Sequence, residues 1–225
     1  MENKIHDMPK LQSPFVRKTN EKGEYIVTSE IAEGYDWVFN DEDVIATEKL
    51  DGTNVSINIE DGIIRGIWNR TERIPFFNKG KRRIVEGVYN AYERGYTEFL
   101  SDGQHFGECI GEGINGNPLG IKGQLWIPFE TYAQEHLAYK SWGKYPKTYD
   151  AISQWFERDL FSLFIMRTQE GKKVFPEGIV FVRKSTGQMA KLRRDMFGWF
   201  TGIRHKDTEM EEKPPVSSPT RGADQ

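Results

Sequence analysis

The sequence predicts an α+β fold in which antiparallel strands form sheets and helices are interspersed among them. Strands are predicted where apolar and polar residues alternate, over residues 44–49, 53–60 and 63–69. Asp61 and Gly62 form a two-residue hairpin turn, so the strands on either side of it are expected to pair antiparallel. Helices are predicted where apolar residues recur at helical spacing, over 79–92 and 149–158.

Length and composition are those of an ordinary globular protein. The 225 residues suffice for one large domain or two small ones, and 37% hydrophobic with 29% charged residues is typical. A net charge of −3 argues against binding nucleic acid over the whole surface but leaves room for a local basic patch. The single Cys109 excludes an intramolecular disulfide and fits a reducing compartment. Because we find neither an apolar signal core nor an apolar run of membrane length, we expect a cytoplasmic monomer without a membrane partner.

The two ends of the chain carry no predicted chemistry. Residues 1–43, interrupted by Pro9 and Pro14, are predicted to be a lead-in with short strands near 15–16 and 25–27 that packs on the main sheet. Residues 206–225, acidic and then rich in proline, are predicted to be disordered. The domain prediction is one functional domain over 1–205, which includes the lead-in.

Lys49 stands at the end of a predicted strand, directly before the Asp51-Gly52 corner. A strand end that enters a glycine turn holds a side chain at the rim of a sheet, and rigid elements position a nucleophile better than loops do. Lysine attacks only as the free amine, so such a site must lower its pKa with nearby cations or a metal. The alternative is an exposed lysine before an Asp-Gly hairpin turn.

A basic cluster opens the helix predicted over 79–92. It consists of Lys79, Lys81, Arg82 and Arg83. The apolar stripe of the same helix consists of Ile84, Val85, Val88, Ala91 and Tyr92. Cations at a helix N-terminus oppose the helix dipole, which favours a polyanion as their partner, although a charged run is also typical of a solvated face. Arg70, at the end of the strand over 63–69, could reach a phosphate or ribose near Lys49 or could be a surface residue.

The second half of the chain contains further candidate residues. Glu108 lies inside an apolar strand that precedes a glycine-rich loop, so it requires a hydroxyl, a cation or a metal as partner. Glu177 precedes a strand over 178–183, and Lys191 and Arg193 alternate on one face of a strand over 188–194. The other predicted elements are a strand over 125–132 and a helix over 149–158 capped by Thr148 or Asp150, whereas 160–166 is too uniformly apolar to assign.

Five segments in fixed order resemble the motifs of covalent nucleotidyltransferases. They are residues 48–54 (motif I), 106–108 (motif III), 126–130 (motif IIIa), 177–180 (motif IV) and 191–193 (motif V). Asn54 after Gly-Thr, and Phe-Gly-Glu followed by Gly-x-Gly-Ile, look most like the RNA ligase 2 group of ATP-dependent ligases. The resemblance runs from about residue 44 to 194. It implies the ligase adenylation domain, an ATP-grasp-like α+β fold with antiparallel sheets, flanking helices and a central ATP cleft.

The resemblance also implies a mechanism. Lys49 would attack the α-phosphate of ATP and carry AMP, which passes to a 5′-phosphate end before a 3′-hydroxyl displaces it. Lys191 and Arg193 would hold the α-phosphate, and Glu177 would bind Mg²⁺ (or Mn²⁺). The implied nucleotide-binding set is Glu48, Lys49, Asn54, Arg70, Glu108, Phe129, Lys191 and Arg193, with Glu108 on the ribose and Phe129 stacked on adenine. Asp51 would orient the lysine corner.

Two departures from the family pattern shape the functional prediction. Arg193 stands where this family usually has lysine, and arginine cannot lose its proton. Only about thirty residues follow motif V, too few for an OB-fold, which argues against a capping enzyme. The sequence therefore predicts an ATP-dependent RNA ligase that acts on RNA or DNA strand ends. The alternatives are a minimal DNA ligase and a nucleic-acid end-binding module that adenylylates itself poorly or not at all.

Overall fold

Antiparallel sheets dominate the computed structural model, which describes residues 4–77, 79–144 and 146–204. Within those residues the strands form three sheets. The five-stranded sheet has the order β6-β5-β4-β7-β8, with β4 (Thr53–Glu60), β5 (Ile63–Asn69), β6 (Glu72–Arg73), β7 (Gly103–Gly111) and β8 (Gln124–Pro128). The three-stranded sheet has the order β10-β9-β3, with β3 (Val44–Lys49), β9 (Gly178–Arg183) and β10 (Met189–Arg193). The third sheet pairs β1 (Phe15–Thr19) with β2 (Tyr25–Ile31).

The five-stranded sheet has one apolar face, which α2 (Arg82–Glu93) covers. Val55, Ile57 and Ile59 of β4 lie in this core, as their alternation predicts. Gly87 allows the close approach of the helix, because a Cβ at that position would lie 2.5 Å from Cys109 Sγ. The predicted stripe of α2 is confirmed for Ile84, Val88 and Ala91, but Tyr92 is 59% exposed because it lies beyond the edge of the packed stripe.

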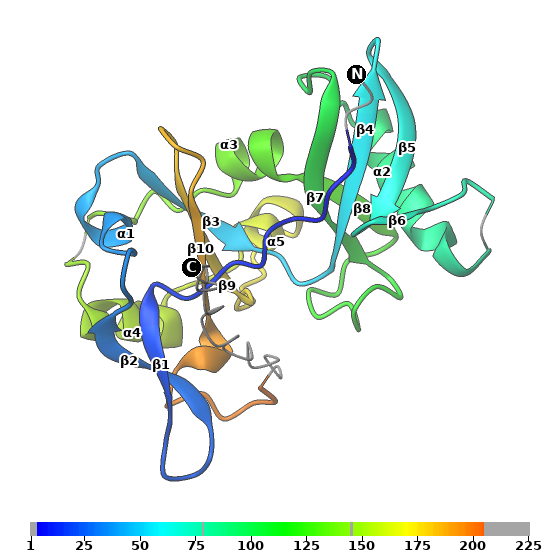
Figure 1. Cartoon of the computed structure of the whole chain (residues 1–225). Coiled ribbons are helices and arrows are strands. Elements are labelled where there is room, and N and C mark those ends of the chain that lie inside the picture. Colours follow the sequence, from blue (N-terminus) through cyan, green and yellow to red (C-terminus); the bar gives the residue numbers. More distant parts are fainter. Residues whose placement is uncertain (1–3, 78, 145, 205–225) are drawn as a thin grey trace, which may run out of the picture.

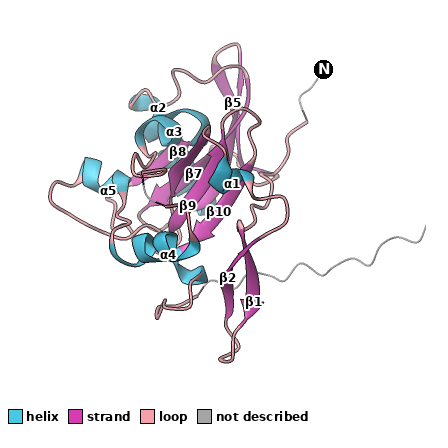
Figure 2. Ribbon diagram, turned by 90° about the vertical axis from the view of Figure 1, so that its left-hand side faces the viewer, coloured by secondary structure: helices cyan, strands magenta, loops and turns pink. Residues whose placement is uncertain are grey.

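A second core joins the three-stranded sheet to α4 (Tyr149–Arg158) through Ile152, Phe156 and Phe181. Thr148, not Asp150, caps α4, because its Oγ1 accepts from the backbone N–H of Ala151. The remaining α-helices are α1 (Trp37–Asn40), α3 (Gln134–His136) and α5 (Leu163–Thr168). Two 3₁₀ helices span Lys79–Lys81 and Arg194–Met196, so the helix predicted from residue 79 begins as a 3₁₀ helix and continues as α2. In Figure 2, α2, α4 and α5 lie on one side of the sheets, and the N-terminal segment runs on the other side.

The Asp51-Gly52 corner is not a hairpin turn. β3 pairs with β9, whereas β4 pairs with β5 and β7, so the chain passes from one sheet to the other at this corner (Figure 1). A Cβ at Gly52 would lie 2.2 Å from the carbonyl oxygen of Cys109, so only glycine fits this crossing. The local signal of an Asp-Gly pair is the same for a hairpin and for a crossing between sheets.

Three other expectations are corrected by the structure. The strand expected over 125–132 ends at Pro128, and a π-helix (Phe129–Ala133) follows that continues into α3. The unassigned run 160–166 contains the start of α5, capped by Ser162; it shows no periodicity because Leu163 packs against both cores. β1 and β2 form a sheet of their own, and Phe15 and Val27 join the core of the three-stranded sheet. The predicted disordered tail lies outside the described residues.

Two further findings concern the rest of the chain. The hairpin turn predicted at Asp61 and Gly62 is confirmed, since both residues have positive φ (54° and 70°) and β4 pairs antiparallel with β5. Within the ranges that the structure describes, none of the helices has the length and apolar character needed to span a bilayer.

Candidate active site

Lys49 and Glu177 meet at the end of the three-stranded sheet. Lys49 closes β3 opposite Gly178 of β9, and its ammonium Nζ lies 2.5 Å from Glu177 Oε2. Both side chains are largely buried, with 22% of Lys49 and 9% of Glu177 exposed. Burial alone would lower the pKa of Lys49, but the carboxylates of Glu177 and Glu108 outweigh it, and the net shift of the pKa is upward. Without a ligand, Lys49 is therefore an ammonium that forms an ion pair with the Glu177 carboxylate.

Glu108 approaches the same ammonium from the five-stranded sheet. It lies on β7 opposite Asn54 of β4, directly after the corner that follows Lys49. Burial raises the pKa of Glu108 to about 8; Lys49 lowers it and Glu177 raises it further. At neutral pH this carboxyl group therefore holds a proton. The Lys49 ammonium beside it is one of the three kinds of partner expected for Glu108, which were a hydroxyl, a cation or a metal.

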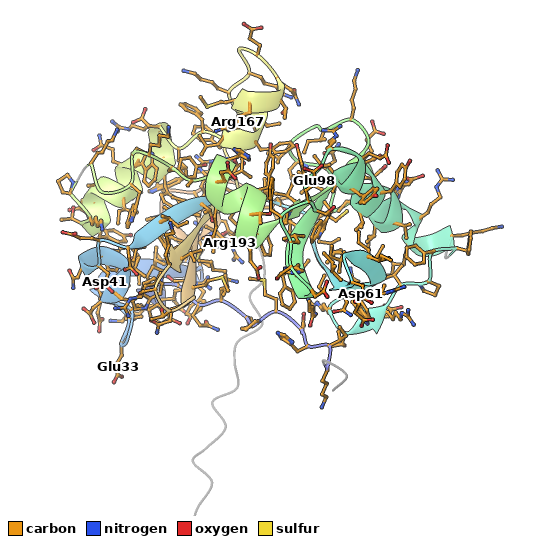
Figure 3. The ribbon with its side chains drawn as sticks, turned by 90° about the horizontal axis from the view of Figure 1, so that it is seen from above. Glu33, Asp41, Asp61, Glu98, Arg167 and Arg193 are labelled. Carbon is orange, nitrogen blue, oxygen red and sulfur yellow. The ribbon has the colours of Figure 1, made fainter. Side chains whose placement is uncertain are left out.

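Arg193 lies on the other side of Glu177. Its Nε donates to Asp195 Oδ1 at 2.8 Å and lies 3.9 Å from Glu177 Oε1. Only 5% of Arg193 is exposed. A Cβ at Gly178 would lie 2.1 Å from the carbonyl oxygen of Leu192, so glycine is required for β9 to approach β10 beside this pair. Viewed from above, Arg193 lies in the middle of the molecule, between the side with Asp41 and the side with Asp61 and Glu98 (Figure 3).

Two residues of this neighbourhood were not predicted from the sequence. Asp195 holds the guanidinium of Arg193, and the Arg-x-Asp spacing is the signal that could have revealed it. Asn115, in the glycine-rich loop after β7, donates from its side-chain Nδ2 to Asp51 Oδ1 and so holds the lysine corner. No local pattern announces this contact, because Asn115 and Asp51 are 64 positions apart.

Glu48 does not join the cluster around Lys49. Neighbouring side chains of a strand point to opposite sides, and the Glu48 carboxylate accepts from Ser162 Oγ at 2.5 Å and from the backbone N–H of Phe164 at 2.8 Å. Burial raises its pKa to about 7, although these two hydrogen bonds lower it. The structure therefore gives this side chain a role in tying β3 to α5, and a contact of Glu48 with the nucleotide stays a prediction.

For the other predicted nucleotide contacts, the strand register and the burial show where each residue lies relative to Glu108 and Lys49. Asn54 faces the same side as Glu108, its register partner. Phe129 is half-buried and follows Ile127, the partner of Glu108 on β8, by two residues. Lys191 is half-buried on β10, and its backbone N–H donates to Gln12 O. Arg70 is exposed with a φ of 57°, one residue beyond Asn69, which lies opposite Val55 near the start of β4.

The basic cluster is divided between a 3₁₀ helix (Lys79–Lys81) and the start of α2, and three of its four cations make local contacts. Lys81 lies 3.8 Å from Glu72, and Arg82 forms an ion pair with Glu86 one turn along the helix at 2.9 Å. Arg83 donates to the carbonyl oxygen of Gly113 at 3.3 Å. The expectation that all four cations serve a polyanion is therefore weakened for Arg82 and Arg83, whereas Lys79 is exposed.

Glu177 and Glu108 could contribute to a magnesium site, but not form one alone. In the described part of the chain, no group of three or more His, Cys, Asp or Glu side chains is placed to hold a metal. Mg²⁺ keeps several waters and binds one or two carboxylates together with substrate phosphates. The residues present therefore fit a magnesium ion that arrives with a phosphate-bearing ligand.

The chain is similar to solved structures of an RNA ligase. No family model matches the chain, and no curated protein matches it. An RNA ligase of Naegleria gruberi solved with PPi is 18% identical, with a TM-score of 0.48, over 70% of this chain and 52% of that one. A lysine-to-alanine mutant of that ligase solved with ATP and Mn is 16% identical, with a TM-score of 0.47, over 83% of this chain and 60% of the other. This chain thus spans between 52% and 60% of the length of these two structures.

Proposed function

We propose that this protein is an ATP-dependent RNA ligase that joins a 5′-phosphate to a 3′-hydroxyl through a covalent adenylate on Lys49. One observation carries the proposal: the Lys49 ammonium lies 2.5 Å from Glu177 and interacts electrostatically with Glu108, where the two sheets meet. The four residues that build this junction, which include Arg193 beside Glu177, come from four of the five segments that resemble nucleotidyltransferase motifs. The RNA ligase 2 group is the member of that superfamily whose motifs this sequence resembles most.

In the first step, Lys49 Nζ attacks the α-phosphorus of ATP. A nitrogen–phosphorus bond forms, the bond to the bridging oxygen breaks, and pyrophosphate leaves. The amine must first lose a proton, and Glu177, at 2.5 Å, is placed to accept it. A divalent cation bound by Glu177 and the phosphates would supply positive charge that favours the free amine. Lys49 is thus an ammonium in the unliganded protein and becomes the free, nucleophilic amine when the ligand binds.

The remaining residues position the ligand. Lys191 and Arg193 contact the α-phosphate, and Arg193, fixed by Asp195, also orients the Glu177 carboxylate. Glu108 and Asn54 bind the ribose, Phe129 stacks on the adenine, and Arg70 contacts ribose or phosphate. In the later steps AMP passes to the 5′-phosphate end, and the 3′-hydroxyl displaces it to seal the strand.

Incubation with ATP labelled at the α-phosphate, followed by denaturing separation, tests this proposal. We expect label that stays on the protein, requires Mg²⁺ or Mn²⁺, and moves to a 5′-phosphorylated strand when one is added. The absence of covalent label would favour the end-binding module over the ligase. Nicked duplexes with RNA or DNA on the 3′-hydroxyl side then distinguish an RNA ligase from a DNA ligase.

A further inference from the structure

The face of the five-stranded sheet that points away from α2 is polar, yet it is buried. Asn54, Ser56 and Asn58 alternate along β4 with the apolar residues of the core. They lie opposite Glu108, Phe106 and Gln104 of β7, in that order. A polar sheet face is ordinarily solvated, but Ser56 and Asn58 are only 1% and 7% exposed. Something other than a helix therefore covers them.

The N-terminal segment provides this cover. The backbone N–H and carbonyl oxygen of His6 both bond to the side-chain amide of Gln104, at 3.1 Å and 2.8 Å. The His6 ring meets Phe106 edge to face, with 5.3 Å between the ring centroids. Gln12 O then accepts from the backbone N–H of Lys191, so residues 6–12 cross from one sheet to the other (Figure 1).

The N-terminal segment packs against the protein with one of its sides. Ile5, Met8 and Leu11 are half-buried, and the residues between them are exposed. This spacing of three is that of an extended, proline-containing segment with one side facing the protein. Residues 5–8 lie outside the strands and helices that the structure describes, so lifting them breaks the His6–Gln104 hydrogen bonds but no sheet or helix ladder.

The N-terminal segment also leaves polar atoms of the sheet face beneath it poorly hydrogen-bonded. Among the residues that the structure describes, Asn54 Nδ2 donates to the sulfur of Met8 at 3.4 Å, and thioether sulfur is a weak acceptor. Asn54 Oδ1 and Asn58 Oδ1 are buried without a hydrogen-bond partner among the described residues. A buried amide oxygen without a donor is costly. The sheet face is therefore equipped for a ligand that brings hydrogen-bond donors.

We propose that residues 5–8 cover a nucleoside-binding face formed by Asn54, Asn58, Gln104 and Phe106, and that they lift from it when a nucleoside binds. The face begins at Glu108, beside Lys49, and offers amide donors and acceptors together with an aromatic ring for stacking. The nucleoside can belong to ATP or to the end of a nucleic-acid strand. This inference rests on the proposed function, because that function brings both ligands to Lys49.

Trypsin cleavage after Lys10 reports the position of the segment. The fragment that begins at Leu11 is quantified by mass spectrometry in the presence of AMP, of ATP with chelator, of a 5′-phosphorylated RNA oligonucleotide, or of pyrophosphate. We expect cleavage about tenfold faster with one or more of the nucleoside ligands, because the exposed population limits the cut, and no change with pyrophosphate. The AMP, ATP and oligonucleotide arms distinguish the two sources of the nucleoside.

Each contrary result overturns the inference in a recognisable way. Equal acceleration by pyrophosphate would mean that phosphate alone moves the segment. Unchanged cleavage in a protein that still forms the covalent adenylate would refute the cover and leave the ligase proposal standing. Unchanged cleavage together with no adenylate would refute both.

A pair of matched variants gives an independent readout. Ile5→Ser with Met8→Ser removes two half-buried contacts of the cover, whereas Lys4→Ser with Gln12→Ser changes two exposed side chains of the same segment. The first pair should lower the ATP concentration for half-maximal labelling about fivefold, because a covered site reduces apparent affinity by the covered fraction. The second pair should leave that concentration unchanged. An increase in the first pair would show that the segment belongs to the ligand site.

Discussion

The three-stranded and five-stranded sheets contribute different chemistry to the candidate site. The three-stranded sheet brings charges into contact, with Lys49 2.5 Å from Glu177 and Arg193 3.9 Å from the same carboxylate. The five-stranded sheet presents mainly neutral hydrogen-bonding groups, such as Asn54 and Gln104. Its residue nearest to Lys49 in this row, Glu108, is protonated at neutral pH. The difference suggests that one sheet carries out the transfer and the other recognises the nucleotide. Mutations in the two sheets should therefore change different kinetic parameters.

The largest effect is expected at Lys49 itself. Lys49→Arg should abolish covalent labelling by ATP while the protein stays folded, because arginine keeps the positive charge beside Glu177 but cannot act as the amine nucleophile. Lys49→Ala should also abolish labelling, but it leaves two buried carboxyl groups without their cation, so its fold must be checked by circular dichroism. Lys18→Ala, an exposed lysine, is the control that keeps its label. Undiminished label on either Lys49 variant would disprove the assignment.

Glu177→Ala should have the next largest effect. We expect labelling about a hundredfold slower at saturating ATP, because the variant loses both the proton acceptor of Lys49 and an oxygen ligand for Mg²⁺. Added Mg²⁺ should restore only part of the rate. Glu170→Ala, which changes an exposed carboxylate in the same connecting segment, should label normally. Labelling of the native protein without any divalent cation would contradict this role.

A change on the five-stranded sheet should appear in binding rather than in the maximal rate. Glu108→Gln keeps the shape of a side chain that is already protonated at neutral pH, since its pKa is raised to about 8. We expect the KM for ATP to rise about tenfold above pH 8, where the native side chain would accept from the ribose as a carboxylate, and the difference to shrink below that pH. Initial labelling rates at pH 6.5 and pH 9 measure this. A decrease in kcat with an unchanged KM would show that Glu108 acts in the transfer step, as Lys49 and Glu177 do. It would refute the division of transfer and nucleotide recognition between the two sheets.

Glu48 joins β3 to the start of α5, so its substitution should change the stability of the folded protein. The carboxylate on β3 binds Ser162 and the start of α5, and Leu163 of that helix packs against both cores. Because burial raises its pKa from 4.5 to about 7, its stabilising contribution is complete below pH 4.5 and is lost as the pH rises through 7. By linkage this loss is worth about 3 kcal/mol.

Glu48→Gln tests that dependence on pH. The native free energy of unfolding should fall by up to about 3 kcal/mol more than that of the variant between pH 5 and pH 8, since glutamine does not titrate. Urea unfolding at the two pH values measures the difference. Parallel pH profiles for the two proteins would mean that Glu48 does not titrate in this range.

The outcomes at individual residues show what the sequence could predict. The alternation in β3, β4 and β7 placed Lys49 and Glu108 at strand positions that the structure brings together, because a period of two fixes which side each residue faces. The same rule places the Glu48 side chain on the side opposite to that of Lys49, where it bonds Ser162 and Phe164. Asn115, Asp195 and the cover over Asn54 depend on contacts between distant segments, for which hydrophobic periodicity carries no signal. The Asp51-Gly52 crossing was ambiguous because the pairing of its flanking strands is decided by the whole sheet.

The smallest effect on adenylylation is expected from the basic cluster before and at the start of α2, which tests whether strand binding is separate from both sheets. Replacing Lys81, Arg82 and Arg83 with serine should weaken strand binding and end joining, and the loss of affinity should be largest at low salt, where released counterions contribute most to binding. The log–log salt slope of strand binding should fall by roughly 0.7 to 0.9 for each phosphate that the protein no longer neutralises. The local contacts of Arg82 and Arg83 make the full reduction for three phosphates an upper limit.

Lys79→Ser with Lys81→Ser is the cleaner variant, because it leaves Arg83 on Gly113 and the loop that holds Asp51 undisturbed. Arg83→Ser alone should slow ATP labelling slightly through that loop, whereas the lysine pair should leave labelling unchanged. Labelling rates and strand affinities of the two variants, measured side by side, make the comparison. A lysine pair that loses ATP labelling but keeps normal strand affinity would show that the start of α2 faces the nucleotide and not the strand.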